Sequence, residues 1–175
     1  MTTTRRTISV ALVMSALIVL PAAPAMASAP DQSCWYDVDT DAMGCFDASL
    51  DPHEQIELET GATLIAVPTG DHGRLQSVVA EADPVYLLAT GWDATAQTGA
   101  SISYYTSNAK ICAGLSHSFS NLQAWNNRFE SLQSYNGCEA YLYDGTGYSG
   151  SEYGPVASSS TLGTFNNRAE SMIVE

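Results

Sequence analysis

Basic residues are the scarcest chemical class in this 175-residue sequence. Six lysines and arginines stand against 19 aspartates and glutamates, which gives a formal net charge of −13 at pH 7. Proteins that bind nucleic acid or an anionic membrane surface need clustered basic side chains facing the phosphate groups. We therefore expect neither a nucleic-acid partner nor a membrane partner.

Long apolar runs are also scarce. Ile8 to Leu20 is too short to span a bilayer, follows Arg5 and Arg6, and precedes the small-x-small pattern Ala25-Met26-Ala27. This arrangement predicts a secretory signal peptide over residues 1–27, so we expect a secreted, extracellular protein. Loss of the two arginines takes the basic count from 6 to 4 and the formal charge from −13 to −15.

Cysteine pairs with the C-x-x-C spacing of zinc sites are absent, and the three histidines are scattered. Export places the cysteines where disulfides persist, and their even number suggests two bridges with three possible pairings. Proximity in sequence favours one pairing, Cys34 with Cys45 and Cys112 with Cys138.

Acidic residues are concentrated in the first part of the mature chain. Residues 28–84 hold 12 acids and one base, whereas residues 85–175 hold seven acids and three bases. The first range contains one helix signal: Asp51 as N-cap, Pro52 at the first helical position and Gly61 as the stop. We interpret residues 28–84 as an acidic N-terminal segment, with Cys34 and Cys45, that precedes a domain over 85–175.

The second range contains a duplicated pattern. The string Asn-Asn-Arg-x-Glu-Ser occurs at 126–131 and again at 166–171, at a fixed offset of 40 residues. Alternating apolar positions and clusters of Gly, Asn and Ser around both copies are typical of short strands and turns. Two copies indicate a duplicated supersecondary unit rather than a solenoid.

Each copy also has a hairpin pattern upstream. Tyr143, Tyr148 and Gly150 form an aromatic-x4-aromatic-x-Gly string, and Trp92 stands as far ahead of Gly99 as Tyr143 does of Gly150. A glycine with positive φ lets such a hairpin fold back, and an aromatic ring covers its bare backbone. Gln97 takes the place of the second aromatic residue in the first unit, so that hairpin is degenerate.

These strings resemble the βγ-crystallin Greek-key family. The resemblance implies an all-β protein, a β-sandwich of two βγ-crystallin-type Greek-key motifs, with units at about 85–135 and 136–175 and a short mixed N-terminal appendage. A signal peptide followed by a short Cys34/Cys45 leader and two such units is also loosely similar to actinobacterial metalloproteinase inhibitors.

The resemblance gives the duplicated residues two sets of roles. It implies that Ser131 and Ser171 bond back to the hairpins of their own units, so that they, like Tyr143, Tyr148, Gly150 and Gly99, are structural. It also implies that the loops supply oxygens to Ca²⁺, and the expected metal ligands are Asn126, Asn127, Glu130, Asn166, Asn167 and Glu170.

Glu130 and Glu170 depart from the family pattern, which has a hydroxyl at that position. A carboxylate strengthens a site built otherwise from neutral oxygens, because calcium affinity rises with ligand charge. Alternatively, each glutamate pairs with Arg128 or Arg168 and takes the place of the cation. Both alternatives remain open from sequence.

No serine, cysteine or histidine stands in a recognisable nucleophile context, so we expect a non-enzymatic protein. The first hypothesis is a secreted, calcium-binding monomer with a structural or stress-related role. The alternative is a secreted peptidase inhibitor on the same fold, whose partner would be a secreted protease. Its candidate loop is the stretch from Ser107 to Asn121, an insertion in the first unit relative to the second.

Overall fold

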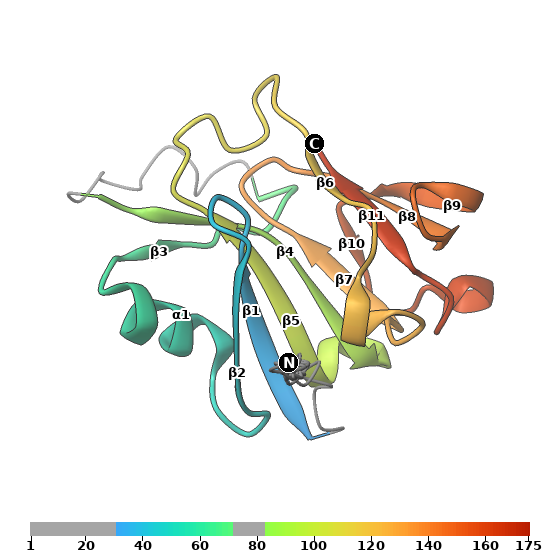
Figure 1. Cartoon of the computed structure of the whole chain (residues 1–175), viewed down its shortest axis with the longest axis horizontal. Coiled ribbons are helices and arrows are strands. Elements are labelled where there is room, and N and C mark those ends of the chain that lie inside the picture. Colours follow the sequence, from blue (N-terminus) through green and yellow to red (C-terminus); the bar gives the residue numbers. More distant parts are fainter. Residues whose placement is uncertain (1–30, 72–82) are drawn as a thin grey trace, which may run out of the picture.

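The computed structural model describes residues 31–71 and 83–175 (Figure 1). The predicted signal peptide, residues 1–27, lies outside these residues. Within the described part of the chain, no helix is long and apolar enough to cross a membrane.

Short strands dominate the described residues, and the helices are few and short. The strands are β1 (Gln32–Asp37), β2 (Ala42–Asp47), β3 (Leu64–Ile65), β4 (Val85–Ala94), β5 (Thr98–Thr106), β6 (His117–Phe119), β7 (Ser131–Ser134), β8 (Ala140–Gly145), β9 (Ser149–Val156), β10 (Ser158–Ser159) and β11 (Ser171–Val174). The helices are α1 (Pro52–Thr60) and the 3₁₀ turns η1 (Thr95–Gln97), η2 (Gln123–Trp125) and η3 (Gly163–Phe165).

The strands form two sheets that exchange one strand with each other. In the first unit β4 pairs with β5 and β7, but β6 crosses over to pair with β11 of the second unit. In the second unit β8 pairs with β9 and β11, and β10 crosses over to pair with β7. The prediction of an all-β sandwich of two Greek-key motifs is confirmed.

The N-terminal segment enlarges the first sheet. Strand β1 runs parallel to β5, β2 pairs with β1, and β3 runs parallel to β4 (Figure 1). The sheet order is therefore β10-β7-β4-β5-β1-β2 with β3 beside β4, whereas the second sheet is β6-β11-β8-β9. The sequence boundary placed between 84 and 85 falls between strands that share one sheet.

Two apolar clusters lie on opposite faces of the enlarged sheet. Between the sheets, Trp125, Phe129 and Leu132 of the first unit pack with residues of the second such as Met172. On the outer face, Ile56 of α1 packs with side chains from β4 and β5. Residues of β1 alternate between these two clusters, as the pleat of a strand requires.

Helix α1 begins and ends where the sequence predicts. The Asp51 side chain accepts hydrogen bonds from the backbone N–H groups of His53 (2.8 Å) and Glu54 (3.2 Å). Pro52 occupies the first turn, and Gly61 closes the helix with φ 66°. These caps satisfy donors and acceptors that a helix end otherwise leaves open.

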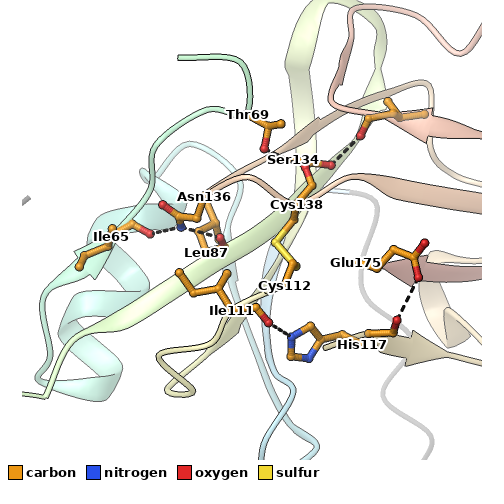
Figure 2. The surroundings of a disulfide bond; sticks show 12 residues. Ile65, Thr69, Leu87, Ile111, Cys112, His117, Ser134, Asn136, Cys138 and Glu175 are labelled. Carbon is orange, nitrogen blue, oxygen red and sulfur yellow. Dashed lines mark hydrogen bonds between the residues drawn. A yellow bond between two sulfur atoms is a disulfide. The ribbon is translucent and has the colours of Figure 1, made fainter. Parts of the chain in front are cut away.

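Two disulfides join the pairs that proximity in sequence favours. Cys34 and Cys45 face each other across β1 and β2, and Cys112 bonds Cys138, which anchors the loop before β6 to the residues before β8 (Figure 2). Bridges of this kind form and persist in oxidising compartments.

Asn136 ties the N-terminal segment to the sandwich. Its buried Nδ2 donates to the carbonyl oxygens of Ile65 and Leu87, both at 2.8 Å, and its Oδ1 accepts from the N–H of Val67 at 3.2 Å (Figure 2). The residue has φ 55°, a left-handed conformation that asparagine tolerates better than most side chains. One side chain thus serves three backbone groups from two segments.

Replacing Asn136 with alanine should destabilise the protein by about 3 kcal/mol or more, because three buried backbone groups lose their partner. Urea unfolding of the two proteins measures the difference. The control is Asn108→Ala, since Asn108 is exposed and its Oδ1 accepts from the N–H of Lys110, a local turn contact. We expect that control to cost less than about 1 kcal/mol, and equal losses would contradict the assigned role.

Candidate functional site: the paired Asn-Asn loops

The two copies of the duplicated string form equivalent loops. Asn126 follows η2 and Asn166 follows η3, with φ values of −55° and −51°. The second asparagine of each loop is left-handed, with φ 58° at Asn127 and 57° at Asn167. Asparagine is suited to that position because its short polar side chain tolerates positive φ.

The serine that ends each string holds the hairpin of its own unit. Ser131 Oγ donates to the carbonyl of Ala94 (2.6 Å) and accepts from the N–H of Gln97 (3.0 Å). Ser171 Oγ makes the equivalent bonds to Gly145 and Tyr148, at the same two distances. Each serine side chain therefore replaces a missing backbone partner within its hairpin.

The hairpins reach their shape through glycine at one position. Gly99 has φ 82° and Gly150 has φ 81°, and a Cβ at Gly99 would lie 2.5 Å from Oδ1 of Asp93. The rings of Tyr143 and Tyr148 meet edge to face, with centroids 6.0 Å apart. The first unit has Gln97 in place of the second ring, and its amide donates to Gln133 and Ser158 instead.

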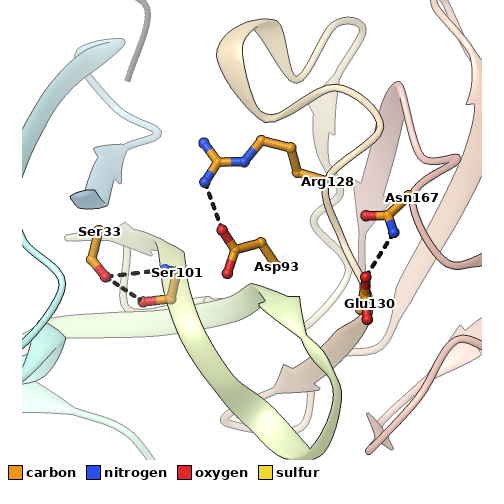
Figure 3. Close-up of polar contacts among 6 residues, drawn as sticks. All are labelled: Ser33, Asp93, Ser101, Arg128, Glu130 and Asn167. Carbon is orange, nitrogen blue, oxygen red and sulfur yellow. Dashed lines mark hydrogen bonds and ion pairs between the residues drawn. The ribbon is translucent and has the colours of Figure 1, made fainter. Parts of the chain in front are cut away.

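Each loop arginine forms an ion pair with an aspartate of the hairpin in its own unit. Arg128 Nη2 lies 2.8 Å from Oδ2 of Asp93 (Figure 3). The Arg128 guanidinium stacks over Trp125, 3.9 Å from the ring centroid. Arg168 makes the equivalent ion pair with Asp144. Both ion pairs join a loop arginine to an aspartate six residues before the hairpin glycine of its own unit.

Asp93 and Asp144 were missed by the sequence reasoning. Each stands six residues before the hairpin glycine of its unit, so a comparison of the two hairpins could have found them. A hydrogen bond from the backbone N–H of Ser151, with a smaller contribution from Arg168, lowers the pKa of Asp144. That carboxyl group stays ionised and available to its arginine.

The glutamates reach across to the opposite loop. Glu130 Oε1 accepts from Nδ2 of Asn167 at 2.7 Å (Figure 3). In the equivalent contact, Glu170 Oε1 accepts from Nδ2 of Asn127 at 3.0 Å. Backbone bonds follow the same exchange, from the N–H of Asn127 to the carbonyl of Ala169 and from Asn167 to Phe129. The structure thus brings four of the six predicted metal residues together as two equivalent cross-loop pairs.

Asn126 supplies the least satisfied oxygen of these loops. Its Oδ1 is buried and has no hydrogen-bond partner among the described residues, whereas the equivalent Oδ1 of Asn166 accepts from Thr161 at 3.4 Å. Across residues 31–71 and 83–175, no group of three or more His, Cys, Asp or Glu side chains could hold a metal ion. A cation at these loops would depend on amide and carbonyl oxygens with few carboxylates.

The insertion from Ser107 to Asn121 is anchored at several points. Its base binds Asp39, which accepts from the Ser107 N–H at 2.7 Å and from the Thr106 hydroxyl. Partial burial tends to raise the pKa of Asp39, but these hydrogen bonds outweigh it and hold the pKa below its usual value. Farther along, His117 Nε2 lies 2.9 Å from the carbonyl of Ile111, next to the Cys112 bridge.

Replacing either motif serine with alanine should cost about 2 kcal/mol, because a backbone N–H and a carbonyl in the hairpin lose their partner. Urea unfolding of Ser131→Ala and Ser171→Ala measures both losses. Ser120→Ala is the matched control, since Ser120 is exposed and only its carbonyl takes part in a backbone bond, from Gly147. Losses no larger than that of the control would show that the hydroxyl bonds do not hold the hairpins.

Comparisons with known proteins give partial likenesses. A scan against protein-family models finds no match, and a search of curated proteins finds none. The N-terminal domain of protein S is 22% identical to this chain, with a TM-score of 0.41. The match covers 50% of this chain and 94% of the protein S domain. A βγ-crystallin domain from Clostridium beijerinckii is 17% identical, with coverages of 50% and 95% and a TM-score of 0.41.

A βγ-crystallin domain from Flavobacterium johnsoniae is 23% identical, with coverages of 50% and 93% and a TM-score of 0.39. A clostrillin double mutant in complex with nickel is 15% identical over 50% of this chain, with a TM-score of 0.40. The neighbours from Clostridium beijerinckii and Flavobacterium johnsoniae are βγ-crystallin domains, and all four structures match half of this chain. The architecture described above stands on the strand pairing of this chain itself.

Proposed function

We propose that this protein is a secreted, non-enzymatic Greek-key protein whose paired Asn-Asn loops bind calcium, and that the bound ion stabilises the sandwich. The observation that carries the proposal is the cross-loop arrangement of Glu130 with Asn167 and Glu170 with Asn127. The buried, unpartnered Oδ1 of Asn126 adds an oxygen that a hard cation would satisfy.

The chemistry of the loops fits calcium better than a transition metal. Calcium takes carboxylate, amide and backbone carbonyl oxygens in flexible geometry, and these are the groups that the loops present. Asn126 and Asn127 with Glu170 would hold one ion, and Asn166 and Asn167 with Glu130 would hold the other. Each ion would supply positive charge between two loops that already contact each other.

The ion pairs of the arginines favour this arrangement. Arg128 and Arg168 form ion pairs with Asp93 and Asp144, whereas Glu130 and Glu170 accept hydrogen bonds from asparagines of the opposite loops. Each glutamate uses one oxygen in its cross-loop bond, Oε1 in both cases. The second oxygen of each carboxylate can then face a cation.

Secretion is supported by two observations of different kinds. The first 27 residues have the n-region, apolar run and cleavage pattern of a signal peptide. Two disulfides join the four cysteines, which is typical of proteins in oxidising compartments. Extracellular calcium-binding modules have dissociation constants of roughly 10⁻⁴ to 10⁻³ M. A low calcium affinity is therefore compatible with the proposed role of a secreted protein.

Chelator-treated mature protein should take up calcium with dissociation constants of roughly 10⁻⁴ to 10⁻³ M, since each loop offers one carboxylate. At 10 mM calcium the melting temperature should rise by roughly 3–10 °C per occupied site. Titration calorimetry and a calcium series of melting curves measure both effects. Absence of heat and of any shift at 10 mM calcium would contradict the proposal.

The contribution of the two glutamates to calcium binding can be tested with a third glutamate as the control. Glu130→Gln and Glu170→Gln should each weaken one calcium site by roughly tenfold, because a charged ligand becomes neutral. Glu59→Gln removes the same charge from an exposed position on α1 and should leave calcium binding unchanged. Replacing both glutamates with serine restores the hydroxyl of the family pattern, and tighter binding by that variant would show that the carboxylates hinder the ion.

Peptidase inhibition is a second candidate, favoured by the anchoring of the 107–121 loop. The bridge from Cys112, the Asp39 contacts at the base and the His117 contact hold this loop while its residues 107–110 stay exposed. A loop held in one conformation loses little entropy when it enters a protease cleft. We retain metalloproteinases as the proposed target class.

The intact protein, in excess, should slow a thermolysin-like protease and leave a subtilisin-like protease unaffected if the loop acts on metalloproteinases. Deleting residues 108–110 from the loop should remove the inhibition while calcium binding persists. Initial rates on a chromogenic peptide measure this. Unchanged rates for both protease classes would reject the inhibitor candidate without affecting the calcium proposal.

A further inference from the structure

The two sheets of the sandwich have unequal widths, and the wider one overhangs the narrower. Strand β5 lies opposite β6, since the rings of Tyr104 and Phe119 are 4.5 Å apart. Strands β1 and β2 extend the first sheet beyond β5, whereas β6 is the last strand of the second sheet. Within the described residues, no strand of the second sheet pairs with the outer edge of β6.

A groove runs along that edge. It is a cavity of about 410 Å³ and is lined on one side by residues 116–123, which include all of β6. Its other side is formed by the inner face of the overhang, including Tyr36 and Met43. The β1–β2 hairpin and β6 belong to different sheets, and both are labelled in Figure 1. A size of this order is typical of ligand clefts.

The backbone of β6 presents free hydrogen-bonding groups to this groove. Glu175 and Glu139 exchange both backbone hydrogen bonds, so alternate residues of β11 face β8. The backbone groups of Glu175, Ile173 and Ser171 therefore point toward β8. Those of Val174 and Met172 point toward β6, where these residues pair with His117 and Phe119. The N–H and C=O of Ser118 then point away from β11, toward the uncovered edge.

The groove contains apolar surface as well as a strand edge. Tyr36 contacts Phe119 edge to face with centroids 5.8 Å apart, and both side chains are only partly buried. Val38 and Met43 also line it and pack at the margin of the core. An extended segment lying beside β6 could place alternate side chains on this surface, as strand-addition ligands do.

The charge around the groove has one sign. Asp41 lines it, and its Oδ1 accepts from the Tyr36 hydroxyl at 2.7 Å. Glu175 lies near the far end, where its carboxylate accepts from the Ser116 hydroxyl. No lysine or arginine is among its lining residues, and the whole chain carries a net charge of −13. A cationic ligand is therefore complementary to the groove.

We propose that this groove binds an extended segment of a partner protein, added as a strand to the outer edge of β6, with apolar side chains on Tyr36, Met43 and Phe119 and a basic side chain beside Asp41. Backbone bonds to Ser118 set the register of the segment. The groove adjoins the Asn-Asn loops at one end, where the N–H of Leu122 donates to the carbonyl of Glu170 at 2.8 Å. The contacts of the proposed segment lie instead on β6 and the β1–β2 hairpin and need no calcium.

The test uses isotope-labelled mature protein and a capped hexapeptide of alternating valine and lysine. Titration should shift the amide resonances of Ser118 and its neighbours saturably, with a dissociation constant of roughly 0.1–1 mM for so short a segment. A peptide with alternate backbone amides methylated should bind about fivefold more weakly, because it loses backbone hydrogen bonds. A valine-glutamate peptide should not bind measurably.

Two protein variants assign the binding to this edge. Ser118→Pro removes an N–H that is not bonded to β11, and proline is tolerated at such a position in an edge strand. This variant should bind the valine-lysine peptide about fivefold more weakly. Asp41→Asn should weaken it about threefold and reduce the salt dependence of binding. Asp31→Asn removes the same charge from an exposed residue outside the groove and should bind as the unmodified protein does.

Several outcomes would overturn the proposal. These are absence of saturable shifts up to 10 mM peptide, equal binding of the methylated peptide, or equal effects of Asp41→Asn and Asp31→Asn. Cellohexaose serves as a probe for a sugar ligand. If it shifts the amide resonances around Ser118 and the peptide does not, the groove binds a sugar and the proposal of a strand ligand is overturned. Circular dichroism and melting curves confirm that each variant is folded, and the Asp41 comparison decides the question if Ser118→Pro is unfolded.

Discussion

The exchange of one strand between the two Greek-key units is the constraint on which the rest of this structure depends. Because β6 pairs with β11 and β10 pairs with β7, neither sheet is complete without the other unit. The same exchange brings the two Asn-Asn loops into contact, where Asn127 meets Ala169 and Asn167 meets Phe129 through backbone bonds. The candidate calcium site is thus a product of the duplication and not of either copy alone.

The N-terminal segment makes this sandwich asymmetric. Buried serines join β1 to β5, where the Ser33 Oγ accepts from the backbone N–H of Ser101 at 3.0 Å (Figure 3). Asn136 ties the β3 region to β4 (Figure 2). The outer face of the enlarged sheet is covered by α1, but the inner face of β1 and β2 extends past β6. The acidic segment therefore has a structural role in the sheet and leaves a groove with an anionic margin.

Local signals in the sequence were sufficient for local structure. Asp51, Pro52 and Gly61 mark both ends of α1 because capping depends on residues within one turn. Short loop lengths favoured the observed cysteine pairing. By contrast, the partners of Arg128 and Glu130 could not be chosen from sequence. Each loop contains an arginine, a glutamate and two asparagines, and the sequence does not show which of these side chains meet across the two loops. Only the tertiary fold placed Asp93 beside Arg128 and Asn167 beside Glu130.

The sequence by itself determined the repeat, and with it the positions of the two left-handed asparagines, the two hairpin glycines and the serines that bond to the hairpins. These depend on backbone conformations that few residue types adopt, so residue identity reports them directly. The tertiary structure decided which loop meets which, how β1 and β2 join the sheet, and where an edge is left open. Those outcomes follow from pairing between segments far apart in the chain, which a local pattern does not encode.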